Sequence, residues 1–329
     1  MKQSNTFGKI TIEFGTADSQ PPDLSSIAQL FAASFQQPFS HELWYWKYGS
    51  RPQYAVTARK DDQAIGHYAG VPRTIHHNKQ RMQLLQITDV MVHPKERAAH
   101  GRQGVFYQMA SRFLEEYVGY NKPFLQAFGF PNERHTRLGV ILGLYGRAGK
   151  MFDVRWEPLA TNPSKLHGYR ELTDHHTIME IADNLWKTIK DSLTSFLVGE
   201  RTGTYMIHRY LQHPLHHYKI YYVYDRITRQ KKGMLVLRQH SDNTFELMDI
   251  LSHLKNMPLI IEIARHIIST QNGLSLFSWM SDAMVEKIAA NAKITDIQVT
   301  IPCITHTPCP KPEELQGKWW LMSGDTDWR

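Results

Sequence analysis

The chain has 329 residues, 42% of them hydrophobic and 21% charged, which is typical of a globular protein with room for two domains. It holds no run approaching the roughly 18 apolar residues of a membrane span, and its start, MKQSNTFGK, lacks the apolar core of a signal peptide, so we expect a soluble, cytoplasmic protein. The 38 Lys and Arg residues exceed the 31 Asp and Glu residues, which gives a formal charge of +7 and favours anionic partners; because the basic residues are scattered, nucleic acid is the weaker candidate.

Periodicity and turn residues divide the first half into strands and helices. Three consecutive strands read as an antiparallel meander, and a helix, a strand, a second helix and a last strand follow it. The expected elements are a strand at 9–14, helices at 21–35 and 41–49, strands at 53–60, 63–77 and 82–93, a helix at 104–118, a strand at 122–130, a helix at 131–146 and a strand at 150–159.

A stretch marked by Pro, Gly and His, at residues 160–177, reads as a linker, and beyond it the order of elements starts again. The second half is therefore expected to repeat the pattern of the first. Its elements are helices at 182–196 and 202–214, strands at 218–226, 232–239 and 245–252, a helix at 260–269 and a strand at 273–279.

An internal repeat supports this division. WYWKYGSRP precedes a strand in the first half as MIHRYLQHP does in the second, and ITDVMV is echoed by LMDILS. The matched pairs are Lys47 with Arg209, Tyr48 with Tyr210, Pro52 with Pro214, Gly66 with Gly233, and Asp89 with Asp249. Two copies of one fold are the economical explanation, and we predict domains at 1–160 and 161–329.

The sequence indicates no metal site. Cys303 and Cys309 are too few for a secreted disulfide framework, and although His306 lies between them, the flanking prolines favour a loop. Adjacent histidine pairs occur, but no H-E-x-x-H or similarly spaced set does. Asp325 and Asp327 in GDTDW imitate a D-x-D metal motif, for which a strand end is the favoured alternative.

A strand that ends in V-x-P, at Val92 and Pro94, leads into a basic, glycine-marked loop, an amphipathic helix, a strand and a short helix opening near Asn132. This order, over residues 80–155, resembles the GCN5-related N-acetyltransferase (GNAT) family. The resemblance implies an α/β (α+β) protein of two tandem GNAT-like domains, each a mixed, mostly antiparallel twisted sheet flanked by helices. The tandem arrangement and the ending KWWLMSGDTDW resemble a bacterial branch linked to polysaccharide biosynthesis.

The resemblance also implies acetyl-CoA, or another acyl-CoA, as co-substrate. Its pyrophosphate would lie on backbone N–H groups of the loop and at the helix N-terminus, and its pantetheine arm would pair with the strand before the loop. The loop departs from the family pattern R/Q-x-x-G-x-G/A, since the first position is Gly101 and the last is Phe106. The binding residues implied are Val90, Met91, Val92, Arg97, Gly101, Arg102, Gln103, Gly104, Val105, Phe106 and Asn132.

Catalysis in the family aligns an amine with an activated thioester, and a general base must deprotonate the amine. Asp89 and His93 are the candidates by position; Asp89 has a structural alternative, since Asp249 repeats it in a half without a glycine loop, and His93 has one as a cap of the loop. No tyrosine occupies the family's usual general-acid position, which falls on Leu138, and Tyr145 is the nearest.

Trp44 and Tyr48 lie where the family's first helices border the acceptor site, so they are candidates for stacking on a sugar, with core packing as the alternative. Asn132 is equally suited to capping a helix. The hypothesis is an acyl-CoA-dependent N-acetyltransferase acting on an amine, with an amino sugar as the candidate acceptor. Its first domain binds the cofactor and its second is degenerate. The alternatives are a non-catalytic assembly protein and a FemAB-like tRNA-dependent aminoacyltransferase.

Overall fold

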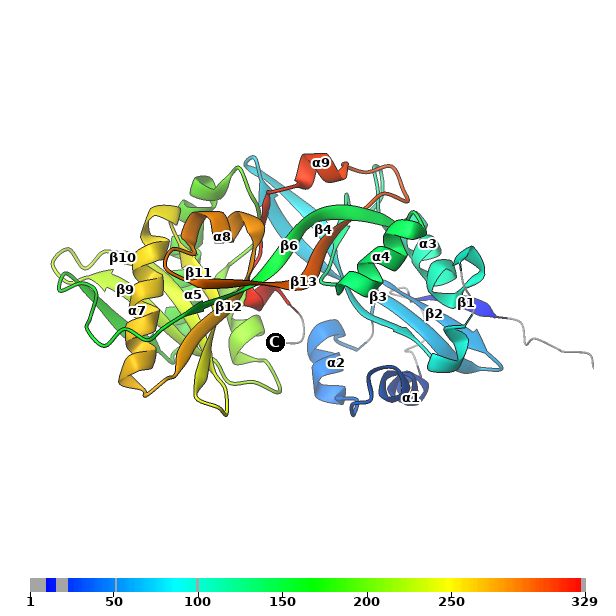
Figure 1. The fold of residues 1–329 in the computed structure, drawn as a ribbon, viewed down its shortest axis with the longest axis horizontal. Helices are drawn as coiled ribbons and strands as arrows, with labels where there is room; N and C mark the ends of the chain where they lie inside the picture. The colour runs from blue at the N-terminus through cyan, green and yellow to red at the C-terminus, as the bar shows by residue number, and fades with distance from the viewer. Residues whose placement is uncertain (1–9, 16–22, 51, 99–100, 327–329) are drawn as a thin grey trace, which may run out of the picture.

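The computed structural model describes residues 10–15, 23–50, 52–98 and 101–326 and contains two mixed sheets flanked by helices. The sheets lie side by side along the longest axis of the molecule, and the strands β6 (Tyr145–Trp156) and β13 (Lys293–Ile304) run between them (Figure 1). The fold class predicted from the sequence is confirmed.

The first sheet has the order β1-β2-β3-β4-β5, joined at its side by β8 and β14. Neighbouring strands from β1 to β4 are antiparallel, whereas β4 and β5 are parallel. The tight turn between β2 and β3 places Asp61 and Asp62 at positive φ, as a two-residue hairpin requires. The bounds are β1 Thr11–Gly15, β2 Ala55–Lys60, β3 Gln63–His77, β4 Gln80–Val92, β5 Ala127–Phe128, β8 Leu197–Gly199 and β14 Trp319–Trp320.

The helices of the first half begin where the sequence supplies caps. Asp23, Ser40 and Asn132 each accept a hydrogen bond from a backbone N–H in the first turn that follows. The helix before β5 has no such cap and begins after Gly104. The bounds are α1 Leu24–Phe35, α2 His41–Tyr48, α3 Val105–Tyr117 and α4 Glu133–Ile141.

The second sheet has the order β13-β6-β12-β11-β10-β9-β7. Helices α5 and α7 cover it (Figure 1). The remaining bounds are β7 His167–Leu172, α5 His175–Ile189, α6 Gly203–Met206 with the π-helical turn Ile207–Leu211, β9 Lys219–Asp225, β10 Lys231–Gln239, β11 Thr244–Ser252, α7 Met257–Thr270, β12 Ser275–Ser281, α8 Asp282–Ile288 and α9 Pro312–Leu315.

Glycines mark the same helix-to-strand contact in both halves. A Cβ on Gly66 of β3 would lie 2.6 Å from Met109 of α3, and a Cβ on Gly233 of β10 would lie 2.5 Å from Ile260 of α7. The absence of a Cβ at both positions leaves room for these helix side chains against the strand. The paired glycines of the sequence therefore have one structural reason.

The halves exchange strands. β6 precedes the predicted boundary at residue 160, yet it lies in the second sheet between β13 and β12. Conversely, β8 follows the boundary and pairs with β3 of the first sheet. Domains at 1–160 and 161–329 stay a prediction, while the two sheets do not divide at one point of the chain.

Three local expectations were wrong. The linker at 160–177 contains β7, which pairs with β9. Cys303 is fully buried at the end of β13 rather than in a loop, because its strand pairs with β6. Asp325 lies in a 3-10 turn rather than at a strand end. Asp327, which the sequence analysis also considered, lies outside the described residues.

Candidate functional site

The site begins where two strands of the first sheet separate. β4 and β5 pair at Leu85 with Ala127 and at Gln86 with Phe128. β4 then continues to Val92, whereas β5 ends at Phe128. Past Gln86 the described part of the two strands forms no further pair, so one edge of β4 is freed. The three strand residues predicted to meet the pantetheine arm, Val90, Met91 and Val92, lie on this freed stretch.

The freed stretch contains a β-bulge at Asp89. The register between β3 and β4 shifts there, because Ala69 faces Thr88 while His67 faces Met91. Asp89 has a φ of 48°, in the left-handed region that non-glycine residues rarely adopt. The bulge bends the strand beside the gap between β4 and β5.

The Asp89 side chain is fixed by α2. The Lys47 ammonium lies 3.2 Å from both carboxylate oxygens, and the Tyr48 hydroxyl donates a 2.6 Å hydrogen bond to Oδ2. Burial acts to raise the pKa of Asp89, but the charge of Lys47 and the hydrogen bond from Tyr48 outweigh it and hold the pKa below its ordinary value. At neutral pH Asp89 is thus an ion-paired carboxylate.

His67 is a neighbour that the sequence did not single out. It is fully buried, its Nδ1 lies 3.2 Å from the Thr57 hydroxyl, and its Nε2 has no partner among the described residues. Burial lowers the pKa of His67 to about 4, against the opposing effect of the Asp89 charge. Its proximity to Asp89 depends on the register of β3 against β4, which no local pattern reveals.

The loop after β4 is hydrogen-bonded to the strand and provides no side-chain cap for the N-terminus of α3. His93 accepts a hydrogen bond from the Lys95 N–H, as its alternative role as a cap required, and Arg97 Nε donates to the Val92 carbonyl at 2.9 Å. Gly101 has a φ of 67°, and Gly104 precedes α3 with no side-chain cap. The first N–H groups of α3 therefore point out of the helix toward the loop.

The residues that open α3 belong to the core. Val105 is buried, and half-buried Phe106 packs against the same hydrophobic cluster. The Phe106 ring lies 6.4 Å from the Tyr68 ring. Phe106, which departs from the family pattern, is thus a packing residue. Arg102 and Gln103 are exposed in the 3-10 turn before the helix.

Asn132 and Tyr145 are both engaged around α4. Asn132 Oδ1 accepts a 3.0 Å hydrogen bond from the His135 N–H and so caps the helix. The Tyr145 hydroxyl donates to the His135 carbonyl at 3.1 Å, and burial raises the pKa of Tyr145 to about 12. Burial and the charges of Arg134 and Arg97 lower the pKa of His135.

Trp44 is 3% exposed, and its ring lies against those of Phe39, Tyr48 and His67. Trp44 thus packs in the core, and its role in stacking on an acceptor stays a prediction. Trp46, on the same helix, instead contacts the second half and donates a hydrogen bond to the His208 carbonyl.

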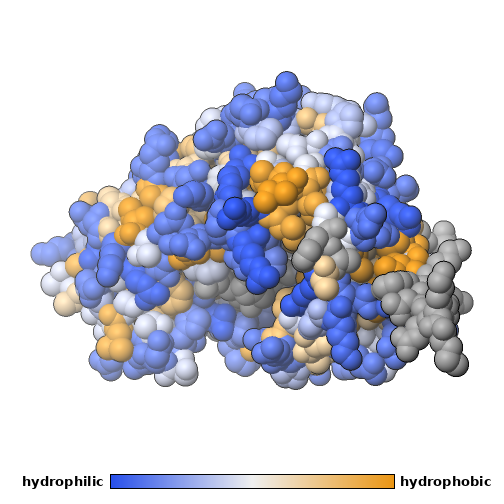
Figure 2. Space-filling view, turned by 45° about the vertical axis from the view of Figure 1, so that its right-hand side comes forward, coloured by the Kyte–Doolittle hydropathy of each residue, from blue (hydrophilic) through white to orange (hydrophobic). Residues whose placement is uncertain are grey.

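The face of the molecule shown in Figure 2 is mainly hydrophilic, with separate apolar patches between the hydrophilic side chains. Among exposed apolar residues, Leu138, Val140 and Ile141 belong to α4. Within the described ranges, no group of three or more His, Cys, Asp or Glu residues could hold a metal ion. In the same residues, no helix is both long and apolar enough to cross a membrane.

Residues 18–139 match the family model of the acetyltransferase (GNAT) domain. No curated protein matches the chain. Over residues 18–139 the chain is similar to a GNAT acetyltransferase domain.

Similar solved structures cover nearly the whole chain. A probable N-acyltransferase from Enterococcus faecalis V583 matches with a TM-score of 0.66 and 12% identity, over 93% of this chain and 74% of that one. A GCN5-related N-acetyltransferase from Anabaena variabilis matches with 0.64 and 13%, over 90% and 72%. The N-myristoyltransferase of Saccharomyces cerevisiae, solved with myristoyl-CoA and inhibitors, matches with 0.52 and 9%, over 90% and 79%. At these identities the likeness is one of fold.

Proposed function

We propose that the chain is an acyl-CoA-dependent N-acyltransferase that transfers an acyl group, acetyl being the simplest, to an amine. The observation that carries this proposal is the separation of β4 from β5 after Gln86, directly before a loop that ends at the uncapped N-terminus of α3. The family model for a GNAT acetyltransferase domain covers this region.

The freed edge of β4 offers backbone partners to the amides of a pantetheine arm. Its Val92 carbonyl already accepts from Arg97, so Val90 and Met91 are the main candidates. The pyrophosphate fits the N–H groups that open α3, where the helix dipole favours negative charge, and Arg97 and Arg102 add charge nearby. Glycines at 101 and 104 keep side chains away from the phosphates.

In the proposed reaction, the amine nitrogen attacks the thioester carbonyl, a C–N bond forms, and collapse of the tetrahedral adduct breaks the C–S bond. A backbone N–H of the bulged strand could stabilise the oxyanion. The amine must first lose a proton. Asp89 and His93 remain the proposed acceptors, and they differ in setting. Asp89 is ion-paired with Lys47, whereas His93 is half-buried and, within the described part of the chain, its side chain has its only hydrogen bond at Nδ1.

The departing thiolate needs a proton, and Tyr145 is the candidate donor. Its raised pKa keeps the hydroxyl protonated at neutral pH, but that hydroxyl is bound to the His135 carbonyl and must exchange partners to act. In Tyr145→Phe, a fall in kcat of about 100-fold would assign the role to Tyr145. An unchanged kcat would leave water as the donor.

The acceptor is proposed to be an amino sugar, with Tyr48 and the exposed Tyr45 on α2 near the place where it would bind. The second half is proposed to be a degenerate GNAT-like domain that acts as a scaffold. Activity assays with amino sugars and with simple amines would test the acceptor class separately from cofactor binding.

The test of cofactor binding is a calorimetric titration with acetyl-CoA and CoA. Gly104→Glu places a negative side chain at the N-terminus of α3 and is expected to abolish binding. Asn256→Glu is the matched control, because Asn256 precedes α7 of the second half as Gly104 precedes α3, and its side chain likewise makes no capping hydrogen bond. Equal affinity in both variants would contradict the proposed site, and a parallel titration with tRNA would test the FemAB-like alternative.

One observation favours a second function, that of a non-catalytic binding protein. The Tyr145 hydroxyl and the Asp89 carboxylate are both engaged within the protein. Binding of acetyl-CoA without turnover of any amine would support this alternative.

A further inference from the structure

The second sheet has a gap like that of the first. β11 and β12 pair in parallel from Thr244 with Ser275 to Glu246 with Phe277. β11 then continues to Ser252 without a further β12 partner among the described residues, as β4 does after Gln86. The two parallel strand pairs therefore open in the same way.

In the second half this gap is filled by residues 319–326 of the same chain. Met322 pairs with Met280 of β12, the Trp279 N–H donates to the Ser323 hydroxyl at 2.8 Å, and the Ser281 N–H donates to the Leu321 carbonyl at 3.0 Å. The segment, red in Figure 1, runs back between the two sheets.

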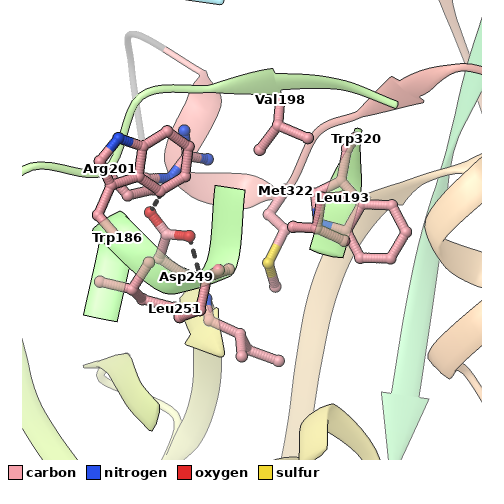
Figure 3. A pocket seen from close by; sticks show the side chains of 10 residues that line it. Trp186, Leu193, Val198, Arg201, Asp249, Leu251, Trp320 and Met322 are labelled. Carbon is pink, nitrogen blue, oxygen red and sulfur yellow. Dashed lines mark hydrogen bonds and ion pairs between the residues drawn. The ribbon is translucent and has the colours of Figure 1, made fainter. Parts of the chain in front are cut away.

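The fit against β11 is close. A Cβ on Gly324 would lie 2.7 Å from the Met248 carbonyl. The residual cavity beside Arg201, Asp249 and Met322 measures about 10 Å³ (Figure 3). That is room for about one water molecule, so no pantetheine arm fits beside the segment.

Asp325 of the same segment forms an ion pair and a hydrogen bond with residues of the first half. This buried carboxylate forms an ion pair with Arg201 at 2.8 Å and with Arg73 of β3 at 3.3 Å. The Asp325 carbonyl accepts a 2.8 Å hydrogen bond from buried Gln86, the last β4 residue that pairs with β5. The segment therefore contacts the first half at the point where β4 and β5 separate.

We propose that residues 319–326 act as an internal ligand: they occupy the gap of the second half, so that each chain binds one acyl-CoA, and through Asp325 they position Gln86 at the base of the first gap. Gln86 is a positioning residue in this proposal, because it acts on the cofactor only through β4. The inference rests on the proposed function for its second part, whereas occupancy of the second gap stands on the contacts above.

Hydrogen exchange on the full chain tests occupancy. The amides of Trp279 and Ser281 should exchange slowly with and without acetyl-CoA, whereas those of Val90 and Met91 should gain protection when acetyl-CoA is added. Ser323→Ala removes the acceptor of the Trp279 N–H and should speed its exchange at least about tenfold, as expected for a local opening. Ser278→Ala, a buried change on the same strand that leaves the segment's contacts intact, is the control.

A calorimetric titration with acetyl-CoA tests the positioning role of Gln86. Wild-type protein should bind one acetyl-CoA per chain. Gln86→Met should raise the Kd for acetyl-CoA about fivefold, the effect of one lost hydrogen bond, with a smaller change in kcat. Gln83→Met, on the exposed part of β4, should leave Kd unchanged. Two sites per chain, or equal Kd in both variants, would overturn the proposal. If wild type binds no acetyl-CoA, the proposed function fails, and the exchange of Trp279 still decides whether the segment fills the second gap.

Discussion

The Tyr48 hydroxyl donates a 2.6 Å hydrogen bond to Oδ2 of Asp89. In the second half the Tyr210 hydroxyl donates a 2.8 Å hydrogen bond to Oδ2 of Asp249. The pair thus recurs at the positions that the sequence repeat matched. What differs is the cation: Lys47 accompanies Asp89, whereas Arg201, which lies outside the repeated motif, accompanies Asp249.

Tyr48→Phe and Tyr210→Phe provide a matched pair of variants. Each removes a hydrogen bond to a buried carboxylate, and we expect each to lower the free energy of unfolding by about 2 kcal/mol. Only Tyr48→Phe should also weaken acetyl-CoA binding, because only Asp89 supports the bulge beside the proposed cofactor site. Urea unfolding and calorimetry measure the two effects, and identical binding in both variants would argue against a role of the bulge.

Asp89→Asn should cost about 3 kcal/mol of stability at pH 7, since it leaves the Lys47 ammonium buried without its partner. The folded pKa of Asp89 lies below the ordinary value of about 3.9. The stabilisation is therefore present above that value and is lost as pH falls through the folded pKa. Unfolding free energies of the wild type and the variant should converge in acid; a constant difference down to low pH would contradict the ion pair.

His67 should make the protein sensitive to mild acid. Its pKa of about 4 in the folded protein lies below its unfolded value of about 6.5. Stability is then complete above pH about 6.5 and falls by up to about 3 kcal/mol as pH drops toward the folded value. In His67→Gln this part of the pH dependence should vanish. A slope as steep as that of the wild type between these pH values would show that His67 is not its source.

Arg97→Met should test the loop without adding a charge. The variant removes the hydrogen bond to the Val92 carbonyl and one positive charge near the proposed pyrophosphate site. We expect the Kd for acetyl-CoA to rise about tenfold, with a shallower dependence of Kd on salt. Arg81→Met, on the exposed hairpin between β3 and β4, is the charge-matched control and should leave Kd unchanged.

The sequence predicted the strands and helices well where periodicity was long, as in β3, β4, α3 and α7. It overestimated β5, which pairs over two residues only, because the hydrophobic run at 122–130 continues past the point where the strands separate. It also missed β7, whose short HGYREL run lies among turn-forming residues. The local sequence pattern reflects the burial of side chains. The length of β5 and the existence of β7 depend instead on pairing with a neighbouring strand.

Site residues on one local motif were predicted more readily than those assembled by the fold. The loop from Arg97 to Gly104 and the α3 N-terminus follow from adjacent residues. The approach of His67 to Asp89 depends on the register of β3 against β4, and the contact of Asp325 with Gln86 joins residues 239 positions apart in the chain. Neither relationship leaves a signal in a single sequence.

The exchange of β6 and β8 between the sheets bears on how the protein could be divided. A cleavage near residue 160 would release one fragment that carries β6 without the strands β12 and β13 beside it, and another that carries β8 without β3. Neither fragment would possess a complete sheet, so the two pieces should remain associated after the cut and unfold together. Because strands of each half complete the sheet of the other, a change that loosens one sheet should also destabilise the other.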